Sequence, residues 1–208
     1  SIWLVPTPPF TMALISTLYF LGSLLYSIPK LRRARQTIKR LKQARDGEQA
    51  VAEYLDTLKS NGCRVLHDIV GEGFNLDHVV IAPQGIFIVE TKTLSKTEGK
   101  NNKIHFDGEK IKINTYEPPR NPVVQAKAQQ TWLTRLLKES TGKDFPVKPV
   151  VVFPGWFVEP MATPKDKLWV IEPKQLKGLL DHESEKLSEN DISLATFHLK
   201  RYIRTKVD

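Results

Sequence analysis

Two short apolar runs, residues 78–82 and 86–89, are the clearest pattern in the chain. Both are rich in valine and isoleucine, and Pro83-Gln84-Gly85 lies between them. Runs of this length and composition favour strands, and a short turn with Pro and Gly between two such runs favours a β-hairpin. We therefore predict a hairpin with Asp77 at the start of its first strand and Glu90 to Lys92 at the end of its second.

Helical and strand patterns alternate around this hairpin. Further strands are predicted at 63–70 and 148–153, and a small second hairpin at 104–113. Helices are predicted at 47–60, 122–138 and 188–204, the first beginning after a break at Asp46-Gly47. This order of elements predicts an α/β fold, with a central mixed sheet and helices on both of its faces.

The predicted helices carry start signals and apolar faces. Asn121 and Ser188 are expected N-caps, with Asp191 completing a pattern similar to a capping box. In the helix over 122–138, apolar contacts are expected from Val124, Ala128, Leu133, Leu136 and Leu137. An adjoining stripe contains Gln125, Gln129 and Trp132. In the last helix, packing is expected from Phe197, Tyr202 and Ile203.

The first part of the chain has a different pattern, because residues 10–28 form an uncharged and mostly apolar run. As a helix this run would span ~28 Å, close to the thickness of the hydrocarbon core of a bilayer. Trp3 and Tyr26 lie where interfacial anchors are expected. The alternatives are a cleaved signal peptide and a buried core helix. The run has no basic residues before it and no small-x-small cleavage pattern, so we expect a transmembrane helix.

Charge is distributed unevenly along the chain. The sequence has 31 Lys and Arg against 23 Asp and Glu, a formal net charge of +8. Residues 30–45 contain eight basic residues and no acidic one, so that segment accounts for the whole excess. A basic segment directly after a membrane span marks the cytoplasmic side. We expect a single-pass protein of the inner (cytoplasmic) membrane, with its N-terminus outside, a basic stalk near anionic lipid headgroups and its domain in the cytoplasm.

The hairpin also predicts a chemical site. Residues on a strand alternate between faces, so Glu90 and Lys92 share one face and Thr91 points away. Folding about Gln84 brings Asp77 beside Glu90 and Thr91. Two carboxylates can hold a hard divalent cation, and a neighbouring lysine can orient water. On the helix over 47–60, Glu48 shares the apolar face with Val51, Ala52, Leu55 and Leu58, which favours a role in the same site.

At these residues the chain resembles the nuclease-related domain (NERD) family of the PD-(D/E)xK nuclease superfamily. The matching blocks occur in the family's order over about residues 46–160. They are Gly47-Glu48, Leu76-Asp77-His78, the run from Gly85 to Lys92, Asn121-Pro122-Val123-Val124-Gln125, and Val150-Val151-Val152-Phe153. We expect four regions: residues 1–29 with a transmembrane helix at about 10–28, a juxtamembrane stalk at 30–45, a nuclease-like domain at 46–160, and a helical extension at 161–208.

The resemblance implies a restriction-endonuclease-like core and metal-dependent hydrolysis of phosphodiester bonds. Asp77, Glu90 and the carbonyl of Thr91 would hold Mg²⁺ or Mn²⁺, with Glu48 in support. Lys92 would position the attacking water, and Gln125 matches a glutamine that lines the active site in RecB-like relatives.

The resemblance further implies a nucleic-acid substrate, with DNA favoured over RNA. The alternative is a non-catalytic module that binds nucleic acid or protein and keeps the fold without the activity. A homo-oligomer or a protein partner that delivers DNA remains open.

Overall fold

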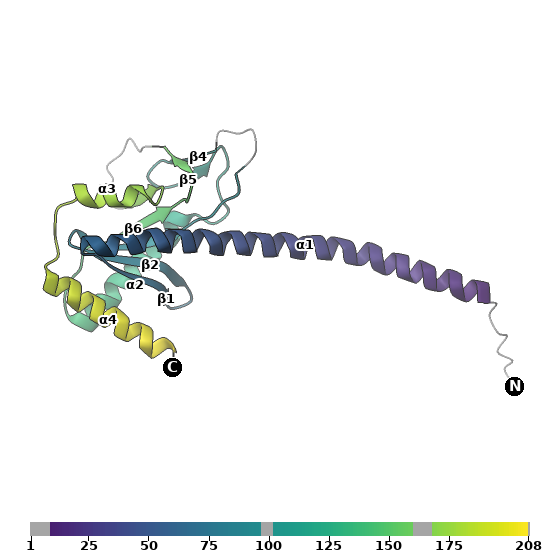
Figure 1. The fold of residues 1–208 in the computed structure, drawn as a ribbon, viewed down its shortest axis with the longest axis horizontal. Coiled ribbons are helices and arrows are strands. Elements are labelled where there is room, and N and C mark those ends of the chain that lie inside the picture. The colour runs from purple at the N-terminus through teal and green to yellow at the C-terminus, as the bar shows by residue number, and fades with distance from the viewer. Residues whose placement is uncertain (1–8, 97–101, 160–167, 208) are drawn as a thin grey trace. The chain divides into compact units, whose positions relative to one another are not determined.

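The computed structural model describes residues 9–96, 102–159 and 168–207, and the expected anchor Trp3 lies outside them. The chain divides into two compact units, residues 1–43 and 44–208. Figure 1 shows the elements of the second unit, in which helices cover a central sheet.

Helix α1 spans Pro9–Thr57, so the predicted break at Asp46-Gly47 is wrong. It continues into a short 3-10 helix, Leu58–Asn61, which ends at Gly62 with φ 81°, as predicted. An interior glycine costs a helix only about 1 kcal/mol relative to alanine. Gly47 has a packing role, because a Cβ at this position would lie 2.0 Å from Thr93 Oγ1. The glycine therefore permits close approach of the chain that follows the hairpin.

The apolar part of α1 is long enough to span a membrane. A window of this helix has a mean hydropathy of 1.5, and none of it is buried within the described structure. Large apolar side chains such as Leu18, Phe20 and Leu25 are exposed. By length and composition alone, α1 is a candidate membrane span.

The central sheet has five strands in the order β1-β2-β3-β6-β8. They are β1 (Arg64–Val70), β2 (Asn75–Ala82), β3 (Gly85–Thr91), β6 (Val147–Val152) and β8 (Trp169–Ile171). The first three pair antiparallel, and β3, β6 and β8 pair parallel. This confirms the predicted mixed sheet. Strand β8 lies beyond residue 160, in the region where only helices were expected.

Three short strands form a second sheet in the order β5-β4-β7. Strands β4 (Lys103–Phe106) and β5 (Ile111–Ile113) pair antiparallel and confirm the small hairpin. Strand β7 (Phe157–Val158) joins β4 in parallel.

Helices cover both faces of the central sheet, as predicted (Figure 1). On one face, α2 (Pro122–Thr141) and α4 (Glu189–Val207) pack through residues such as Leu133 and Ile192. On the other face, the end of α1 and α3 (Gln175–His182) pack through residues such as Leu55 and Leu176. Strand residues of β2 and β3 alternate between these two cores, which explains why both runs are continuously apolar.

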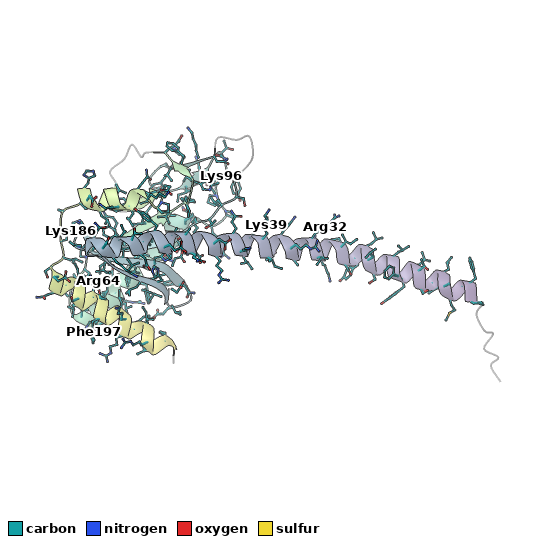
Figure 2. All side chains as sticks on the ribbon, viewed as in Figure 1. Arg32, Lys39, Arg64, Lys96, Lys186 and Phe197 are labelled. Atoms are coloured by element: carbon teal, nitrogen blue, oxygen red, sulfur yellow. The ribbon has the colours of Figure 1, made fainter. Side chains whose placement is uncertain are left out.

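Several predicted packing residues face solvent instead. Val124 and Ala128 on α2 are exposed, whereas Val123 and Ala126 are buried. On α4, Phe197 is 62% exposed (Figure 2), while Tyr202 and Ile203 pack against the core as expected. The prediction for α2 was wrong because the buried face includes the polar Gln129. Choosing only apolar residues therefore placed the buried face on the neighbouring stripe.

The predicted cap of α4 can be tested by mutation. Ser188 Oγ accepts from the Asp191 amide at 3.2 Å, and Asp191 Oδ2 accepts from the Ser188 amide and hydroxyl at 3.1 and 2.7 Å. We predict that Ser188→Ala lowers the free energy of unfolding by about 0.5–2 kcal/mol, measured by urea denaturation. Ser184→Ala, in the preceding loop, is the control and should change it little. Equal effects of the two substitutions would contradict the capping role.

Candidate active site

The register of the hairpin brings Asp77 opposite Glu90. His78 pairs with Val89, so the next facing residues toward the end of β3 are Asp77 and Glu90. The Thr91 amide donates to Asp77 Oδ2 at 2.7 Å. The hairpin thus places the three residues together, as the sequence predicted.

Glu90 is a buried carboxylate, only 3% exposed, whose two oxygens both accept hydrogen bonds. Oε1 accepts from Lys92 Nζ at 2.6 Å and from Gln125 Nε2 at 2.7 Å. Oε2 accepts from Gln129 Nε2 at 2.7 Å. Lys92 Nζ also donates to Gln125 Oε1 at 3.0 Å. A buried charge is stable only when it is paired and hydrogen-bonded, and these three side chains supply that compensation.

Helix α2 presents both glutamines because residues four apart lie on one face of a helix. Its start is fixed by Asn121, whose side chain accepts from the Val123 amide at 3.0 Å, and by a proline at the first helical position. Gln129 also donates to the Asn75 carbonyl at 3.2 Å, which links α2 to the start of β2. The sequence placed Gln129 on this stripe and assigned it no role. The spacing of four residues between Gln125 and Gln129 was the sequence feature that could have indicated a shared role.

Glu48, on α1, lies in the electric field of the same site. It is half-buried, and burial is the main reason that its pKa is raised, followed by the negative charges of Asp68 and Glu90. The positive charge of Lys92 partly offsets this effect. The predicted place of Glu48 near the hairpin carboxylates is therefore consistent with the structure.

Asp68 is an acidic residue that the sequence reasoning missed. His67 pairs with His78 and Ile69 with Leu76, so the register of β1 and β2 places Asp68 opposite Asp77. Asp68 is exposed and has φ 53°, a left-handed conformation that is uncommon for residues other than glycine. Its place beside Asp77 follows from the pairing of β1 with β2, for which the sequence carries no local signal.

Asp77 has a strongly perturbed acidity. Burial and the neighbouring charge of Glu90 raise the pKa of Asp77 to about 7, and Glu48 adds to the effect. The Thr91 amide and Lys92 act in the opposite direction. Burial of the carboxyl group is the larger cause of this shift, and repulsion by neighbouring carboxylates adds to it.

His78 is adjacent to Asp77 in sequence and lies on the other face of the sheet. It is buried, and its Nδ1 lies 2.9 Å from His67 Nδ1, while His67 Nε2 lies 3.0 Å from Asp56 Oδ1. Burial, and then His67, lower the pKa of His78 to about 4. His78 is therefore neutral at pH 7 and supports packing.

The donor chemistry of the site suits a hard divalent cation. Within residues 9–96, 102–159 and 168–207, no three His, Cys, Asp or Glu side chains are grouped as a metal site. The carboxylates of Asp77 and Glu90 nevertheless face one another across the hairpin. Over the same residues, Gln129 Oε1 beside Glu90 is buried without a hydrogen-bond partner. Oxygen donors of these kinds are those that Mg²⁺ and Mn²⁺ prefer.

The nuclease-related domain model matches residues 43–154, which is more than half of the chain. The chain belongs to the nuclease-related domain (NERD) family. This confirms the resemblance of the sequence blocks, and the match contains Glu48, Asp77, Glu90, Lys92 and Gln125. No curated protein matches the chain.

A solved structure, Pyrococcus furiosus SfsA in complex with Ca²⁺, is 16% identical, with a TM-score of 0.28. The alignment covers 79% of this chain and 54% of SfsA, so the chain spans about half the length of that protein. A likeness at this TM-score supports no inference about this NERD protein.

The hydrogen bond between Gln129 and Glu90 can be tested by a double-mutant cycle. Gln129→Leu removes one donor from a buried charge, so we predict a loss of about 1–3 kcal/mol in the free energy of unfolding. In the Glu90→Gln background the loss should be smaller, because the unpaired group is then neutral. Urea denaturation of the four proteins gives the coupling energy. A coupling energy of zero would show that Gln129 does not stabilise the Glu90 charge.

Proposed function

We propose that this NERD protein is a metal-dependent nuclease that hydrolyses phosphodiester bonds, with DNA as its substrate. The observation that carries the proposal is the grouping of Asp77, Glu90 and Lys92 at one end of the central sheet, within a nuclease-related domain. The mixed sheet with helices on both faces agrees with the restriction-endonuclease-like core of the PD-(D/E)xK superfamily, to which we assign the domain.

We infer that Asp77, Glu90 and the Thr91 carbonyl hold Mg²⁺ or Mn²⁺, with Glu48 in support. Such a cation lowers the pKa of a bound water and neutralises charge on a phosphate. Burial raises the pKa of Asp77 most, and the charges of Glu90 and Glu48 add to it. The inference is supported because a bound cation would offset both effects.

Lys92 adds a positive charge to the site in addition to that of the bound cation. Its side chain is 28% exposed, and Glu90 and Gln125 both hold the ammonium in place. A fixed ammonium at this position can orient a water for in-line attack and stabilise the negative charge that develops on the phosphate oxygens. Gln125 acts as a positioning residue, since it contacts both Lys92 and Glu90.

A second candidate function follows from the hydrogen bonds of Glu90. Both oxygens are already occupied by Lys92 and two glutamines, so the carboxylate is stable without a cation. This arrangement favours a non-catalytic module that binds nucleic acid or a protein through the same fold. The two functions differ in whether a divalent cation competes with Lys92 for Glu90 Oε1.

Cleavage by the full chain, solubilised in a maltoside detergent, separates the two functions. We predict that it cleaves DNA in the presence of Mn²⁺ or Mg²⁺, and that Lys92→Ala lowers the rate by ~10²–10⁴. The control is Lys177→Ala, since Lys177 pairs with Asp181 on α3 and should not affect the rate. Binding of single- or double-stranded DNA or RNA without any cleavage would establish the non-catalytic module instead.

Metal binding is measured independently of cleavage. We predict that Asp77→Asn weakens the binding of Mn²⁺ to the full chain in calorimetry, because one anionic oxygen ligand is lost. Lys92→Ala should retain Mn²⁺ binding, since lysine is not a ligand. Asp144→Asn, in an exposed pair with Lys138, is the matched control. The assignment of the metal site fails if Asp77→Asn binds Mn²⁺ as tightly as the wild type.

We also propose that the protein is anchored in the inner membrane by the apolar part of α1, with its domain in the cytoplasm. Support comes from the uncharged run over 10–28 and from the eight basic residues over 30–45, which suit anionic lipid headgroups. Residues 46–208 carry 23 basic and 23 acidic residues, because the remaining eight basic residues all lie in 30–45.

Alkaline carbonate extraction tests the anchor. We predict that the wild type stays in the membrane pellet. Replacement of both Leu18 and Leu21 by Arg should move the protein to the supernatant, because each charge costs about 2.5–3.5 kcal/mol at the centre of a span. Release of the wild type by carbonate would favour peripheral attachment through the basic segment.

A further inference from the structure

A cavity lies at the other end of β3 from the candidate active site. Its volume is about 470 Å³, and its lining includes Gln84 and Gly85 at the hairpin turn. Glu90 lies five residues after Gly85 along the strand, a distance of roughly 17 Å. Cavities of about 300–1,000 Å³ are typical of sites for small ligands. The cavity is therefore separate from the carboxylate site and large enough for a compact organic anion.

Backbone contacts at the turn shape this cavity. Gly85 has φ 145°, and a Cβ there would lie 3.1 Å from the Pro146 carbonyl oxygen. The Pro146 carbonyl accepts from the Ile86 amide at 2.9 Å. The Pro83 carbonyl accepts from the Lys186 amide at 2.7 Å, which fixes the segment that carries Lys186 beside the turn. Main-chain hydrogen bonds thus hold the turn, Pro146 and Lys186 in place around the cavity.

The charge of the lining is positive. It includes Lys127, Lys148 and Lys186, and it includes no carboxylate. Lys148 Nζ lies 2.8 Å from Glu183 Oε1, and Lys186 Nζ lies 3.2 Å from Glu183 Oε2. One carboxylate is therefore shared by two ammonium groups. Over the described residues, Lys127 has no ion pair, so the cavity carries an excess of about two positive charges.

The lining also offers groups that can hydrogen-bond an oxyanion. Gln130 holds its place by donating from Nε2 to the Val147 carbonyl at 2.7 Å. Thr131, one turn beyond Lys127 on α2, also lines the cavity, and its hydroxyl donates to the Lys127 carbonyl at 3.1 Å, a bond that a bound oxyanion would have to replace. Lys148 is fixed over the Trp169 ring, with Nζ 4.2 Å from the ring centroid. Several ammonium groups beside an amide donor suit a phosphate better than a carboxylate, because a phosphate has more oxygens and more charge.

We propose that this cavity binds a phosphomonoester. A phosphomonoester carries about −1.5 to −2 charges at pH 7, which matches the excess of two ammonium groups, whereas an internal phosphodiester carries one. The same chemistry occurs in a free mononucleotide and at the phosphorylated end of a nucleic-acid strand. The proposal does not depend on the nuclease function, because it involves none of the residues at the other end of β3.

The test uses the full chain in a maltoside detergent and a phosphate-free buffer. Adenosine monophosphate, adenosine, and an octathymidylate with and without a 5′-phosphate are titrated by calorimetry. Lys127→Ala removes the ammonium that has no ion pair among the described residues. Thr131→Glu adds a carboxylate to the lining, and glutamate is a residue that favours helix formation. The matched controls on the same helix are Lys138→Ala and Ala128→Glu, since neither residue lines the cavity. Melting curves confirm that each variant folds.

We expect adenosine monophosphate to bind and adenosine to bind at least about tenfold more weakly. Lys127→Ala and Thr131→Glu should each weaken the nucleotide at least about tenfold, while the controls change its affinity less than about twofold. Binding of the octathymidylate only when it is 5′-phosphorylated would identify a strand end as the source, and its failure to bind would identify a free phosphomonoester. Equal affinity for adenosine, no binding of the nucleotide, or unchanged affinity in folded Thr131→Glu would overturn the proposal.

Discussion

The buried charge of Glu90 is the constraint on which the arrangement of the site depends. A carboxylate that is 3% exposed on a central strand must be compensated, and the compensating groups come from two parts of the fold. Lys92 follows directly after β3, while Gln125 and Gln129 come from α2. Because Gln129 also contacts the start of β2, one carboxylate ties together the hairpin and the helix that covers it.

The remaining carboxylates make the site short of positive charge. Asp77 faces Glu90 across the hairpin, and Glu48 lies within the field of both Glu90 and Lys92. One ammonium cannot neutralise three carboxylates, and this imbalance adds to burial, which is the main cause of the raised pKa of Asp77. The fold itself does not require such a concentration of acidic groups. A site that binds a divalent cation requires such a concentration. This grouping of carboxylates therefore favours the nuclease over the non-catalytic module.

Local patterns predicted the hairpin, the caps of α2 and α4 and the mixed sheet, because turn chemistry, capping and alternation act over a few residues. Properties set by contacts between distant segments were missed. Gly47 does not stop α1, since its lack of a side chain accommodates Thr93. Gln129 is buried despite its polarity because Glu90 requires a donor. Asp68 and β8 likewise depend on strand pairing, which a single sequence does not reveal.

Residues 46–208 are neutral in total charge, and their structure separates opposite charges along one strand. Acidic groups gather at the Glu90 end of β3, whereas three lysines surround the cavity at the Gly85 end. Glu183 neutralises only part of that positive charge. A domain with balanced composition can therefore present one end to a cation and the other to an anion. Net charge would have hidden both sites, because recognition depends on the local arrangement of charged groups rather than on their sum.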